Sequence, residues 1–496
     1  MSITEIPTQT PRSPLTEFAA SLTAAGPVAD YIRAGIIGKN ALFDTPFGKQ
    51  KLVYADYVAS GRALRQVEDF VMEQVLPYYA NSHTDSSFCG GYMTAMREQA
   101  RAIILDLCGG NSRDHAAIFS GSGATAALNQ LVHLLGIEEA IEAGQAPQIL
   151  VGPYEHHSNL LPWRESGANV IAIDEAPHGG PDLAHLAKVL AEVSPKGPVI
   201  CAFSAASNVT GILTDIVPVT KLVKSAGAKM VWDFAGGAPY LPIDMSPEEE
   251  ALIDAVAISA HKFIGGPGAS GLLLVRRDLV VAQIPARPGG GTVAFVNDEV
   301  QDYSPHLEER EEGGTPNIIG DIRAALVMLV KDAIGQEFIT AKNADLTARA
   351  FNAWRGNDDI QLLGATHENR LPILSFIVRD QDGAPVDYDI FTRMLSDIYG
   401  IQARGGCACA GPYVHRLLNI DAAWSNQIRD KIRNGDESDK PGFIRLNLSY
   451  LMDESEVDYI LRSVVELAHS AAAIATDYPA SAATFVAAKS AATAAA

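Results

Sequence analysis

The sequence SAHKFIGGPG at residues 259–268 lies between two short apolar runs, at 255–258 and 271–275. Such runs are typical of buried strands, so Lys262 stands where an ammonium group is unusual. An ordinary surface lysine on a turn is one interpretation. A desolvated amine at a strand end can instead form a Schiff base with a carbonyl cofactor, usually pyridoxal phosphate (PLP). This stretch alone leaves both interpretations open, and motifs elsewhere in the chain bear on the choice between them.

The size and charge of the chain limit the number of domains and the kinds of partner that we expect. With 496 residues it is long for one hydrophobic core, so we expect two globular parts plus tails. Its 38 basic and 59 acidic residues give a formal charge of −21, whereas nucleic acids and anionic membranes are bound through basic patches. No apolar run approaches the roughly 18 residues that span a bilayer, and residues 1–14 lack a secretory signal pattern.

The five cysteines are few, odd in number and scattered along the chain. This usage favours a reducing cytosol over a disulfide framework. We therefore expect a cytoplasmic protein that binds neither nucleic acid nor membrane.

Short apolar runs alternate with helical patterns through the middle of the chain. Strands are expected at 148–152, 170–173, 199–203, 230–233, 255–259 and 272–275, and helices at 62–79, 94–107, 124–135, 182–193 and 216–226. Apolar strands joined by helical crossovers predict an α/β fold with a mostly parallel sheet covered on both faces. Ligands of such sheets bind at the carboxyl ends of the strands.

The later part of the chain predicts a smaller α+β region, with strands at 371–378 and 443–448 and a closing helix at 454–468. We expect four regions in all. These are a lead-in at 1–45, a large domain at 46–319, a small domain at 320–470 on which part of the N-terminal segment packs, and an Ala-rich tail at 471–496.

A turn of small residues, SGSGAT at 120–125, lies between a short apolar run and a helical pattern. Backbone N–H groups at a helix N-terminus bind anions. A Gly/Ser turn before a helix is by itself more often only a cap. Because Lys262 is also present, we expect this turn to help bind the phosphate of the cofactor. The residues expected to form that cradle are Gly123, Ala124, Thr125, Ser259 and His261.

Paired histidines occur in YEHHSN at 154–159, directly after another expected strand. Two histidines at a strand end suggest a metal, but no further ligand residue stands at suitable spacing nearby, so we expect none. A ring that stacks on a flat cofactor and moves protons is the favoured interpretation, with His156 as the preferred residue.

Asp233 ends the apolar strand at 230–233, where a carboxylate is costly to bury without a cationic partner. A protonated pyridine nitrogen would supply that partner and keep the ring an electron sink. An Asp that caps the next helix is the ordinary alternative. Asn208, after the strand at 199–203, is expected to bind the phenolic oxygen of the cofactor or the substrate.

The loop RGGCACAGP at 404–412 contains two cysteines flanked by glycines. Their place favours access over core packing, and a cationic neighbour such as Arg404 favours the nucleophilic thiolate. A Cys-x-Cys pair can also bind metal, but companion ligands are missing. Arg445, within the strand at 443–448, suits a bidentate clamp on a substrate carboxylate.

The order of these motifs resembles that of the class V, fold-type I PLP enzymes, specifically the cysteine desulfurase and selenocysteine lyase branch. The resemblance extends from about residue 54 to 467. The matching pieces are YAD at 54–56, GAT at 123–125, EHHSN at 155–159, SNV at 207–209, Asp233, SAHK at 259–262, GGTPN at 313–317, the loop at 404–412 and Arg445. It implies PLP as cofactor, a large domain with a seven-stranded, mostly parallel sheet, a smaller α+β C-terminal domain, and a homodimer.

The resemblance also implies roles for the residues that bind the cofactor. Lys262 would form the Schiff base and remove the substrate α-proton, Asp233 would hold the pyridinium nitrogen, and His156 would stack on the ring and relay protons. The implied phosphate ligands are Thr125, Ser259 and His261, together with Thr315 from the second subunit.

On the substrate side, the resemblance implies that Arg445 clamps the substrate carboxylate. The family's loop pattern puts its arginine at Arg404 and its reactive cysteine at Cys409, which leaves Cys407 as an extra thiol. Gly236 is a departure, because the family's desulfurases usually carry Gln at that position. The loop also departs from the branch that has two histidines before its cysteine.

Three functions remain open after these departures. The leading hypothesis is a desulfurase-like lyase that converts L-cysteine to alanine and leaves a persulfide on Cys409, from which an acceptor protein or a small thiol takes the sulfur. The alternative is another class V PLP enzyme, an aminotransferase, epimerase or β/γ-lyase acting on a different amino acid. The third is a protein of the same fold that serves as a non-catalytic scaffold.

Overall fold

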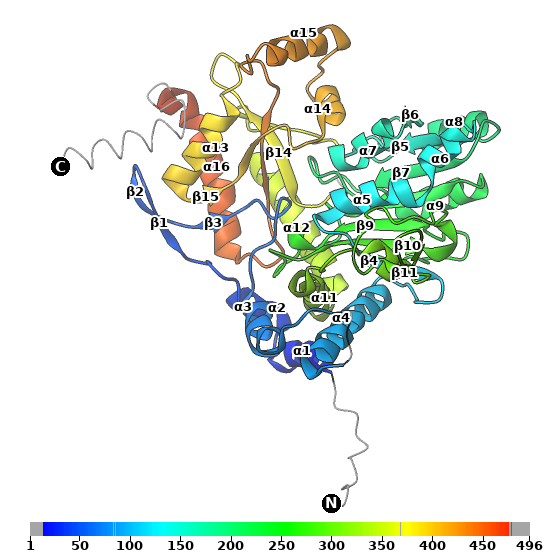
Figure 1. Ribbon diagram of the computed structural model, residues 1–496. Coiled ribbons are helices and arrows are strands. Elements are labelled where there is room, and N and C mark those ends of the chain that lie inside the picture. The colour runs from blue at the N-terminus through cyan, green and yellow to red at the C-terminus, as the bar shows by residue number, and fades with distance from the viewer. Residues whose placement is uncertain (1–12, 83, 85, 368, 476–477, 479–496) are drawn as a thin grey trace, which may run out of the picture. The chain divides into compact units, whose positions relative to one another are not determined.

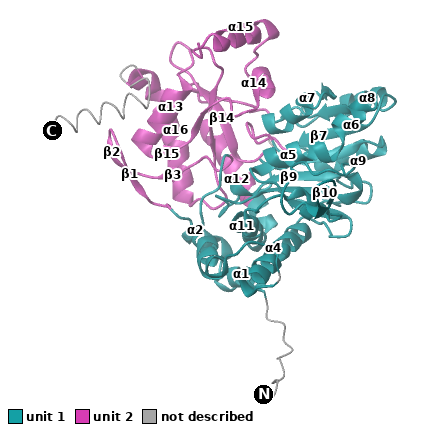
Figure 2. Ribbon diagram, viewed as in Figure 1, with its two compact units in different colours: residues 1–37, 59–206, 214–340 teal, residues 38–58, 207–213, 341–496 magenta. Residues whose placement is uncertain are grey.

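The computed structural model describes residues 13–82, 84, 86–367, 369–475 and 478. It divides the chain into two compact units (Figure 2). The described residues of unit 1 fall within 1–37, 59–206 and 214–340, and those of unit 2 within 38–58, 207–213 and 341–496. Most of the predicted Ala-rich tail lies outside the described residues, and the predicted domain limits stay a prediction.

Unit 1 is built on a seven-stranded sheet (Figure 1). In spatial order its strands are β4 (His115–Phe119), β10 (Gly271–Arg276), β9 (Ala255–Ser259), β8 (Lys229–Asp233), β7 (Val199–Ser204), β5 (Gln148–Val151) and β6 (Asn169–Ala172). Strand β10 is antiparallel to both of its neighbours, and the pairs from β9 to β6 are all parallel. The predicted α/β fold with a mostly parallel sheet is therefore confirmed.

Helices and one exposed hairpin surround this sheet. The helices are α1 (Pro14–Ala24), α2 (Val28–Ala34), α3 (Arg65–Phe70), η1 (Val71–Val75), η2 (Leu76–Tyr78), α4 (Phe88–Leu107), α5 (Gly123–Leu134), α6 (Ile137–Glu142), η3 (His157–Asn159), α7 (Leu161–Glu165), α8 (Leu183–Val193), α9 (Ile216–Ser225), η4 (Ala260–Lys262), η5 (Arg277–Leu279), α10 (Leu307–Glu311) and α11 (Ile318–Ile334). The hairpin is β11 (Val293–Val296) with β12 (Gln301–Tyr303).

Side-chain caps explain where several of these helices begin. Asp182 accepts hydrogen bonds from two backbone N–H groups of α8, and Asn317 accepts one from Gly320 in α11. Helix α4 begins at Phe88, six residues before the predicted start, because Ser87 caps it by accepting from the Gly90 N–H. Two glycines in its first turn hide this start in the sequence, since glycine weakens the helical pattern.

The sheet is covered on both faces because alternate strand residues point to opposite sides. On one face, Val231 and Ala257 belong to an apolar cluster that includes Leu131 of α5. On the other face, Trp232 donates through Nε1 to Thr220 Oγ1 of α9 at 3.0 Å. With both faces buried, the polar groups at the strand ends are left as places where a ligand can reach the sheet.

A buried ion cluster joins helix α4 to the segment that precedes α11. Glu312 accepts hydrogen bonds from Arg97, from Arg101 at 2.8 Å and from the Phe119 N–H at 2.7 Å, while Arg97 also reaches Asp321 at 2.7 Å. Burial raises the pKa of Glu312, but the two guanidinium groups outweigh burial and bring the pKa below its usual value. Every charge in this cluster depends on its partners, since the side chains are almost fully buried.

Unit 2 contains a four-stranded antiparallel sheet in the order β13 (Ile360–Leu362), β14 (Ile373–Val378), β17 (Phe443–Asn447), β16 (Arg404–Gly406). Its other strands are β1 (Leu42–Thr45), β2 (Gly48–Lys51), β3 (Val53–Tyr54) and β15 (Ile401–Gln402). Its helices are α12 (Gln336–Trp354), within which the two units meet along the chain, α13 (Tyr388–Tyr399), α14 (Gly411–Leu417), α15 (Ala422–Arg433) and α16 (Glu454–Ala475).

An aromatic core holds unit 2 together. The Phe376 ring of β14 lies 5.2 Å from Trp354 and 6.1 Å from Phe391, centroid to centroid. Trp354 also donates through Nε1 to the carbonyl of Leu461 in α16 at 3.1 Å.

Among the helices of the described residues, none combines the length and the apolar character that a membrane span requires.

We expect Glu312→Gln to lower the free energy of unfolding by about 3–5 kcal/mol, because it leaves two buried guanidinium groups short of negative charge. Urea unfolding of the variant and the parent protein measures the difference. Glu98→Gln is the matched control, because Glu98 pairs with the same Arg101 but is 56% exposed. The free energy of unfolding of Glu98→Gln should fall by less than about 1 kcal/mol. Equal losses in both variants would contradict the role of burial.

Candidate functional site

The polar side chains predicted for the cofactor in unit 1 lie at the carboxyl edge of the sheet. Asp233 is the last residue of β8 and pairs in register with Ala257 of β9, two residues before Ser259 ends that strand. The short helix η4 follows at once and places Lys262 just beyond the same edge. Parallel neighbouring strands bring these residues together, as the strand pattern predicts.

Asp233 is only 3% exposed, and its Oδ1 accepts a hydrogen bond from the Ala235 N–H at 2.8 Å. Burial raises the pKa of its carboxyl group, while the Ala235 bond and the positive charge of Lys262 act in the opposite direction. The Lys262 ammonium is therefore close enough to affect the charge of the Asp233 carboxyl group. A further cation beside Asp233 would stabilise its ionised form.

The N-terminus of α5 meets the end of β9 at Gly123. The Ala124 N–H donates to Ser259 Oγ at 2.9 Å. A Cβ atom added to Gly123 would lie 2.9 Å from Ser259 Oγ and 3.0 Å from His261 Cε1, and Gly123 has a φ of +66°. Glycine is thus required here both by space and by backbone conformation.

His261 is half-buried beside this turn. Burial, and then the neighbouring Lys262 charge, lower the pKa of its imidazole. The ring is therefore neutral near pH 7 and acts there as a hydrogen-bonding group rather than as a cation.

Thr125 and His156 are joined through Ser158, which the sequence analysis did not select. Thr125 Oγ1 lies 2.7 Å from Ser158 Oγ, which in turn lies 3.0 Å from His156 Nδ1. The Ser158 N–H also donates to His156 Nδ1 at 3.1 Å. Because Nδ1 accepts, the proton of the neutral His156 ring resides on Nε2. Ser158 thus sets the tautomer of the histidine predicted to stack on the cofactor.

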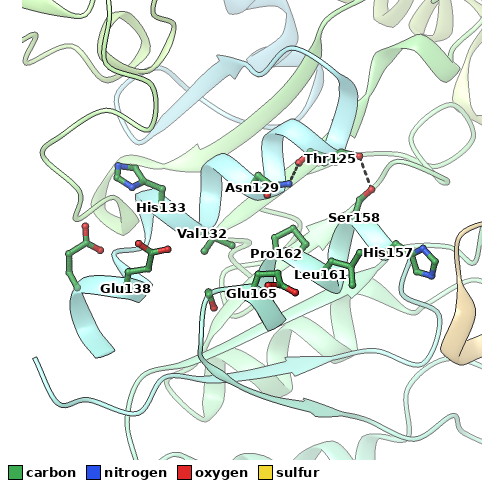
Figure 3. A pocket seen from close by; sticks show the side chains of 12 residues that line it. Thr125, Asn129, Val132, His133, Glu138, His157, Ser158, Leu161, Pro162 and Glu165 are labelled. Carbon is green, nitrogen blue, oxygen red and sulfur yellow. Dashed lines mark hydrogen bonds between the residues drawn. The ribbon is translucent and has the colours of Figure 1, made fainter. Parts of the chain in front are cut away.

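A pocket of about 470 Å³ adjoins this chain of hydrogen bonds, between α5, α6 and α7 (Figure 3). Thr125 and Ser158 lie on its wall, where Asn129 donates to the Thr125 carbonyl at 2.8 Å. Neither Lys262 nor Asp233 belongs to its lining. The pocket is therefore a neighbour of the predicted cofactor site and not the site itself.

Glu155 anchors the turn that bears His156. Its carboxylate accepts from the Ser204 N–H at 2.9 Å, from Ser204 Oγ at 2.7 Å and from Asn159 Nδ2 at 2.5 Å. Burial raises the pKa of this carboxyl group to about 7, although the hydrogen bonds act in the opposite direction. Glu155 was predicted only as part of the EHHSN motif. Its anchoring role depends on contact with Ser204 at the end of β7, which the local sequence does not reveal.

In unit 2, Asp56 lies between two arginines. Arg445 donates to Asp56 Oδ1 at 3.1 Å and Arg404 donates to Asp56 Oδ2 at 3.0 Å. Arg445 is 3% exposed, and burial lowers the pKa of its guanidinium despite the Asp56 charge. Asp56 belongs to the YAD motif at 54–56, and its two partners lie too far along the chain for a local pattern to predict its role.

Arg445 also donates to the Asn208 carbonyl at 3.0 Å, and Asn208 Nδ2 donates to the Ala408 carbonyl at 2.8 Å. Arg445 Nε and Asn208 Oδ1 are buried and have no hydrogen-bond partner among the described residues. Buried groups of this kind are normally satisfied, so a bound polar molecule is the natural partner. Unit 2 therefore groups the predicted substrate residues Arg404, Arg445 and Asn208 with the cysteine loop.

The residues of unit 1 fit PLP. The Gly123 turn leaves a cradle of N–H and hydroxyl donors at a helix N-terminus, which suits a phosphate. Asp233 offers a buried carboxylate to the pyridinium nitrogen, and Lys262 an amine to the aldehyde. Thr315 lies on an exposed segment between α10 and α11, and its role in a second subunit stays a prediction. Among the described residues no group of three potential metal ligands is found.

A mostly parallel sheet with a lysine and an aspartate at its carboxyl edge, joined to a smaller α+β unit, defines a protein of the fold-type I PLP class. The chain belongs to the aminotransferase class-V family, whose model matches residues 53–460.

Known proteins similar to this chain include two curated relatives. One is a probable cysteine desulfurase of Streptomyces coelicolor, 27% identical over 73% of this chain and 84% of the relative. Another is a probable cysteine desulfurase of Pyrococcus abyssi, 28% identical over 74% of this chain and 87% of the relative.

Solved structures show the same fold. A cysteine desulfurase from Thermococcus onnurineus NA1 has a TM-score of 0.72 at 23% identity, covering 88% of this chain and 98% of that protein. A cysteine desulfurase from Escherichia coli has a TM-score of 0.65 at 23% identity, covering 84% of this chain and 94% of that protein. The resemblance inferred from the motifs is confirmed at the level of family and fold.

We expect Glu155 to make the stability of the protein depend on pH. Its pKa is about 7 in the folded protein against an ordinary value of 4.5, so the unfolded chain releases the proton first as pH rises. The contribution of Glu155 is thus fully present below about pH 4.5 and falls by up to about 3 kcal/mol as pH rises through 7. Thermal unfolding of the protein and of Glu155→Gln between pH 5 and 8 measures it. A difference between the two that does not change with pH would contradict this assignment.

Proposed function

We propose that this protein is a PLP-dependent cysteine desulfurase, which removes sulfur from L-cysteine to give alanine and an enzyme persulfide on Cys409. The observation that supports it most is an exposed thiol, Cys409, on a loop tied to buried Arg445, in a chain that also places Lys262 beside Asp233. The curated relatives of this chain are named probable cysteine desulfurases.

The cofactor would be held by unit 1. Lys262 would bind its aldehyde, Asp233 its ring nitrogen, and the turn at Gly123 its phosphate, with Thr125, Ser259 and His261 as further donors. His156 would stack on the ring, in the orientation that Ser158 sets. When bound, PLP supplies an aldehyde for the substrate amine and a ring that withdraws electrons from the substrate Cα.

The residues of this chain would then perform the remaining steps. Lys262 Nζ takes the proton from the substrate Cα. The Cys409 thiolate attacks the substrate sulfur, so that a sulfur–sulfur bond forms and the carbon–sulfur bond of the substrate breaks. The Cβ of the substrate accepts a proton, Lys262 Nζ returns a proton to Cα, and alanine leaves. Cys409 retains the substrate sulfur as a persulfide.

Arg445 would bind the substrate carboxylate. Its Nε is buried without a partner among the described residues, and Asp56 and the Asn208 carbonyl hold the rest of the guanidinium in place. Asn208 would contact the cofactor or the substrate from the same segment. Arg404, which is about half exposed, would stay paired with the other oxygen of Asp56.

The wider setting belongs to the same proposal. The enzyme would act as a homodimer in which Thr315 of each subunit reaches the other's phosphate. A sulfur-acceptor protein or a small thiol would take the persulfide sulfur. We place the protein in the cytoplasm, because its scattered cysteines suit a reducing compartment.

The reaction is tested by incubating the holoenzyme with L-cysteine. We expect alanine and an equal amount of sulfur, released or bound to protein. Cys409→Ser should lower alanine formation at least about 100-fold, because the attacking thiolate is lost, while the cofactor absorbance band stays. Unchanged turnover in Cys409→Ser would exclude Cys409 as the nucleophile. Keto-acid products or racemised amino acid in place of alanine would favour another class V enzyme.

The phosphate cradle is tested with two glycines of the same turn. We expect Gly123→Ala to weaken PLP affinity at least about tenfold, because its Cβ would displace Ser259 and His261. Gly121→Ala is the matched control, since Gly121 also has a positive φ of +61° but open space around its Cα. The PLP affinity of Gly121→Ala should change by less than about threefold. Titration of each apoprotein with PLP measures the two affinities. Equal losses of PLP affinity in the two variants would show that the phosphate binds elsewhere.

A further inference from the structure

Two thiols lie two residues apart on the loop between β16 and α14. Cys409 is exposed and Cys407 is partly exposed. In contrast, Cys108 and Cys201 are buried, and burial raises the pKa of both thiols, to about 12 for Cys108. Both loop thiols are thus accessible to reagents and to each other, yet the proposed reaction uses only Cys409.

The loop forms a defined turn around the pair. The Ala410 N–H donates to the Cys407 carbonyl at 3.4 Å, which closes a four-residue turn. Its two central residues, Ala408 and Cys409, have φ values of 51° and 55°. Residues other than glycine seldom adopt this left-handed conformation, which costs about 1–2 kcal/mol for each. Asn208 holds the turn from the same unit through its hydrogen bond to the Ala408 carbonyl.

Such a turn brings the two cysteines within bonding reach. Residues two apart span at most about 7 Å between Cα atoms even in an extended chain. Cα atoms joined by a disulfide lie about 4.4–6.8 Å apart. The spacing of Cys407 and Cys409 along the chain is therefore compatible with a disulfide between them.

The two thiols have different charged neighbours. Burial lowers the pKa of Arg445, and Asp56 and, to a smaller extent, the Cys409 thiol act in the opposite direction, so Cys409 lies within electrostatic reach of that guanidinium. Burial and the neighbouring Asp389 and Asp387 raise the pKa of Tyr388, at the start of α13, and the Cys407 thiol adds to this effect. Cys409 is thus the thiol beside the predicted substrate-binding arginine, and Cys407 is the second thiol, set back from it along the turn.

We propose that Cys407 is a resolving thiol that releases the sulfur from Cys409 as hydrosulfide. This inference rests on the proposed function, which loads Cys409 with a persulfide. The Cys407 thiolate attacks the inner sulfur of the persulfide. A Cys407–Cys409 disulfide forms, the bond between the two persulfide sulfurs breaks, and hydrosulfide leaves with the electron pair.

The two loop cysteines supply the electrons that release the sulfur. The two cysteines are oxidised to a disulfide, and the transferred sulfur is reduced from the persulfide level to sulfide. The proton of Cys407 goes to solvent or to the departing hydrosulfide. A dithiol reductant then restores both thiols before the next turnover. The sulfur product is accordingly free hydrosulfide, and turnover is linked to the supply of dithiol.

The test is a single turnover of the holoenzyme with L-cysteine under anaerobic conditions without added thiol. Alanine and hydrosulfide are measured, and the loop peptide is weighed by mass spectrometry. We expect about one hydrosulfide for each alanine and a loop peptide that has lost two hydrogens. In Cys407→Ser the ratio of hydrosulfide to alanine should fall at least about tenfold, and the loop peptide should gain one sulfur atom at Cys409. Cys407→Ala repeats the measurement with a different replacement.

Cys89→Ser is the matched control, since Cys89 is also partly exposed but lies on α4. The ratio of hydrosulfide to alanine in Cys89→Ser should stay near that of the parent protein. The inference is overturned if Cys407→Ser releases hydrosulfide at the parent ratio, if the parent loop retains a persulfide, or if the extra sulfur is found on Cys407.

A second arm separates this inference from the proposed function. Cys409 is loaded directly with sulfur from glutathione trisulfide, without L-cysteine. A loop disulfide and hydrosulfide in the parent protein, with a stable persulfide in Cys407→Ser, would support the resolving role even if L-cysteine gives no alanine. A stable persulfide in the parent protein would refute that role even if L-cysteine does give alanine.

Discussion

The site in unit 1 depends on the interaction of a buried carboxylate with an ammonium at the carboxyl edge of the sheet. Asp233 is almost fully buried, and burial alone disfavours its charge. Lys262, at the end of the neighbouring strand, acts in the opposite direction. Both residues are positioned by the parallel pairing of β8 with β9. A cofactor that brings a cation to Asp233 and an aldehyde to Lys262 would satisfy both groups at once.

Close backbone approach shapes the turn that is predicted to hold the phosphate. The start of α5, the end of β9 and the start of β10 converge there, and a Cβ at Gly271 would lie 2.4 Å from the Gly123 carbonyl oxygen. Only glycine allows this spacing, so small residues at two distant positions are needed to form this one turn. Around it, Ser158 and Glu155 orient the histidine turn through hydrogen bonds to Thr125 and Ser204.

Unit 2 contributes a different electrostatic arrangement. One carboxylate, Asp56, serves two arginines, so the guanidinium of buried Arg445 is held in place but not fully satisfied. That arrangement leaves a directed donor for a carboxylate ligand. The cysteine turn lies on the next segment of the same unit, tied through Asn208. Substrate binding and sulfur transfer would thus both depend on this small group of contacts.

The sequence by itself predicted the alternating strands and helices of the large sheet and placed Lys262, Asp233 and His156 after strand ends, because hydrophobic periodicity is a local property. It also indicated the family through the spacing of motifs. Only the tertiary structure decided which groups meet. Asp56 contacts arginines 348 and 389 residues away, and Ser158 joins Thr125 to His156. Such pairings depend on how distant segments pack, and no local pattern of residue types encodes them.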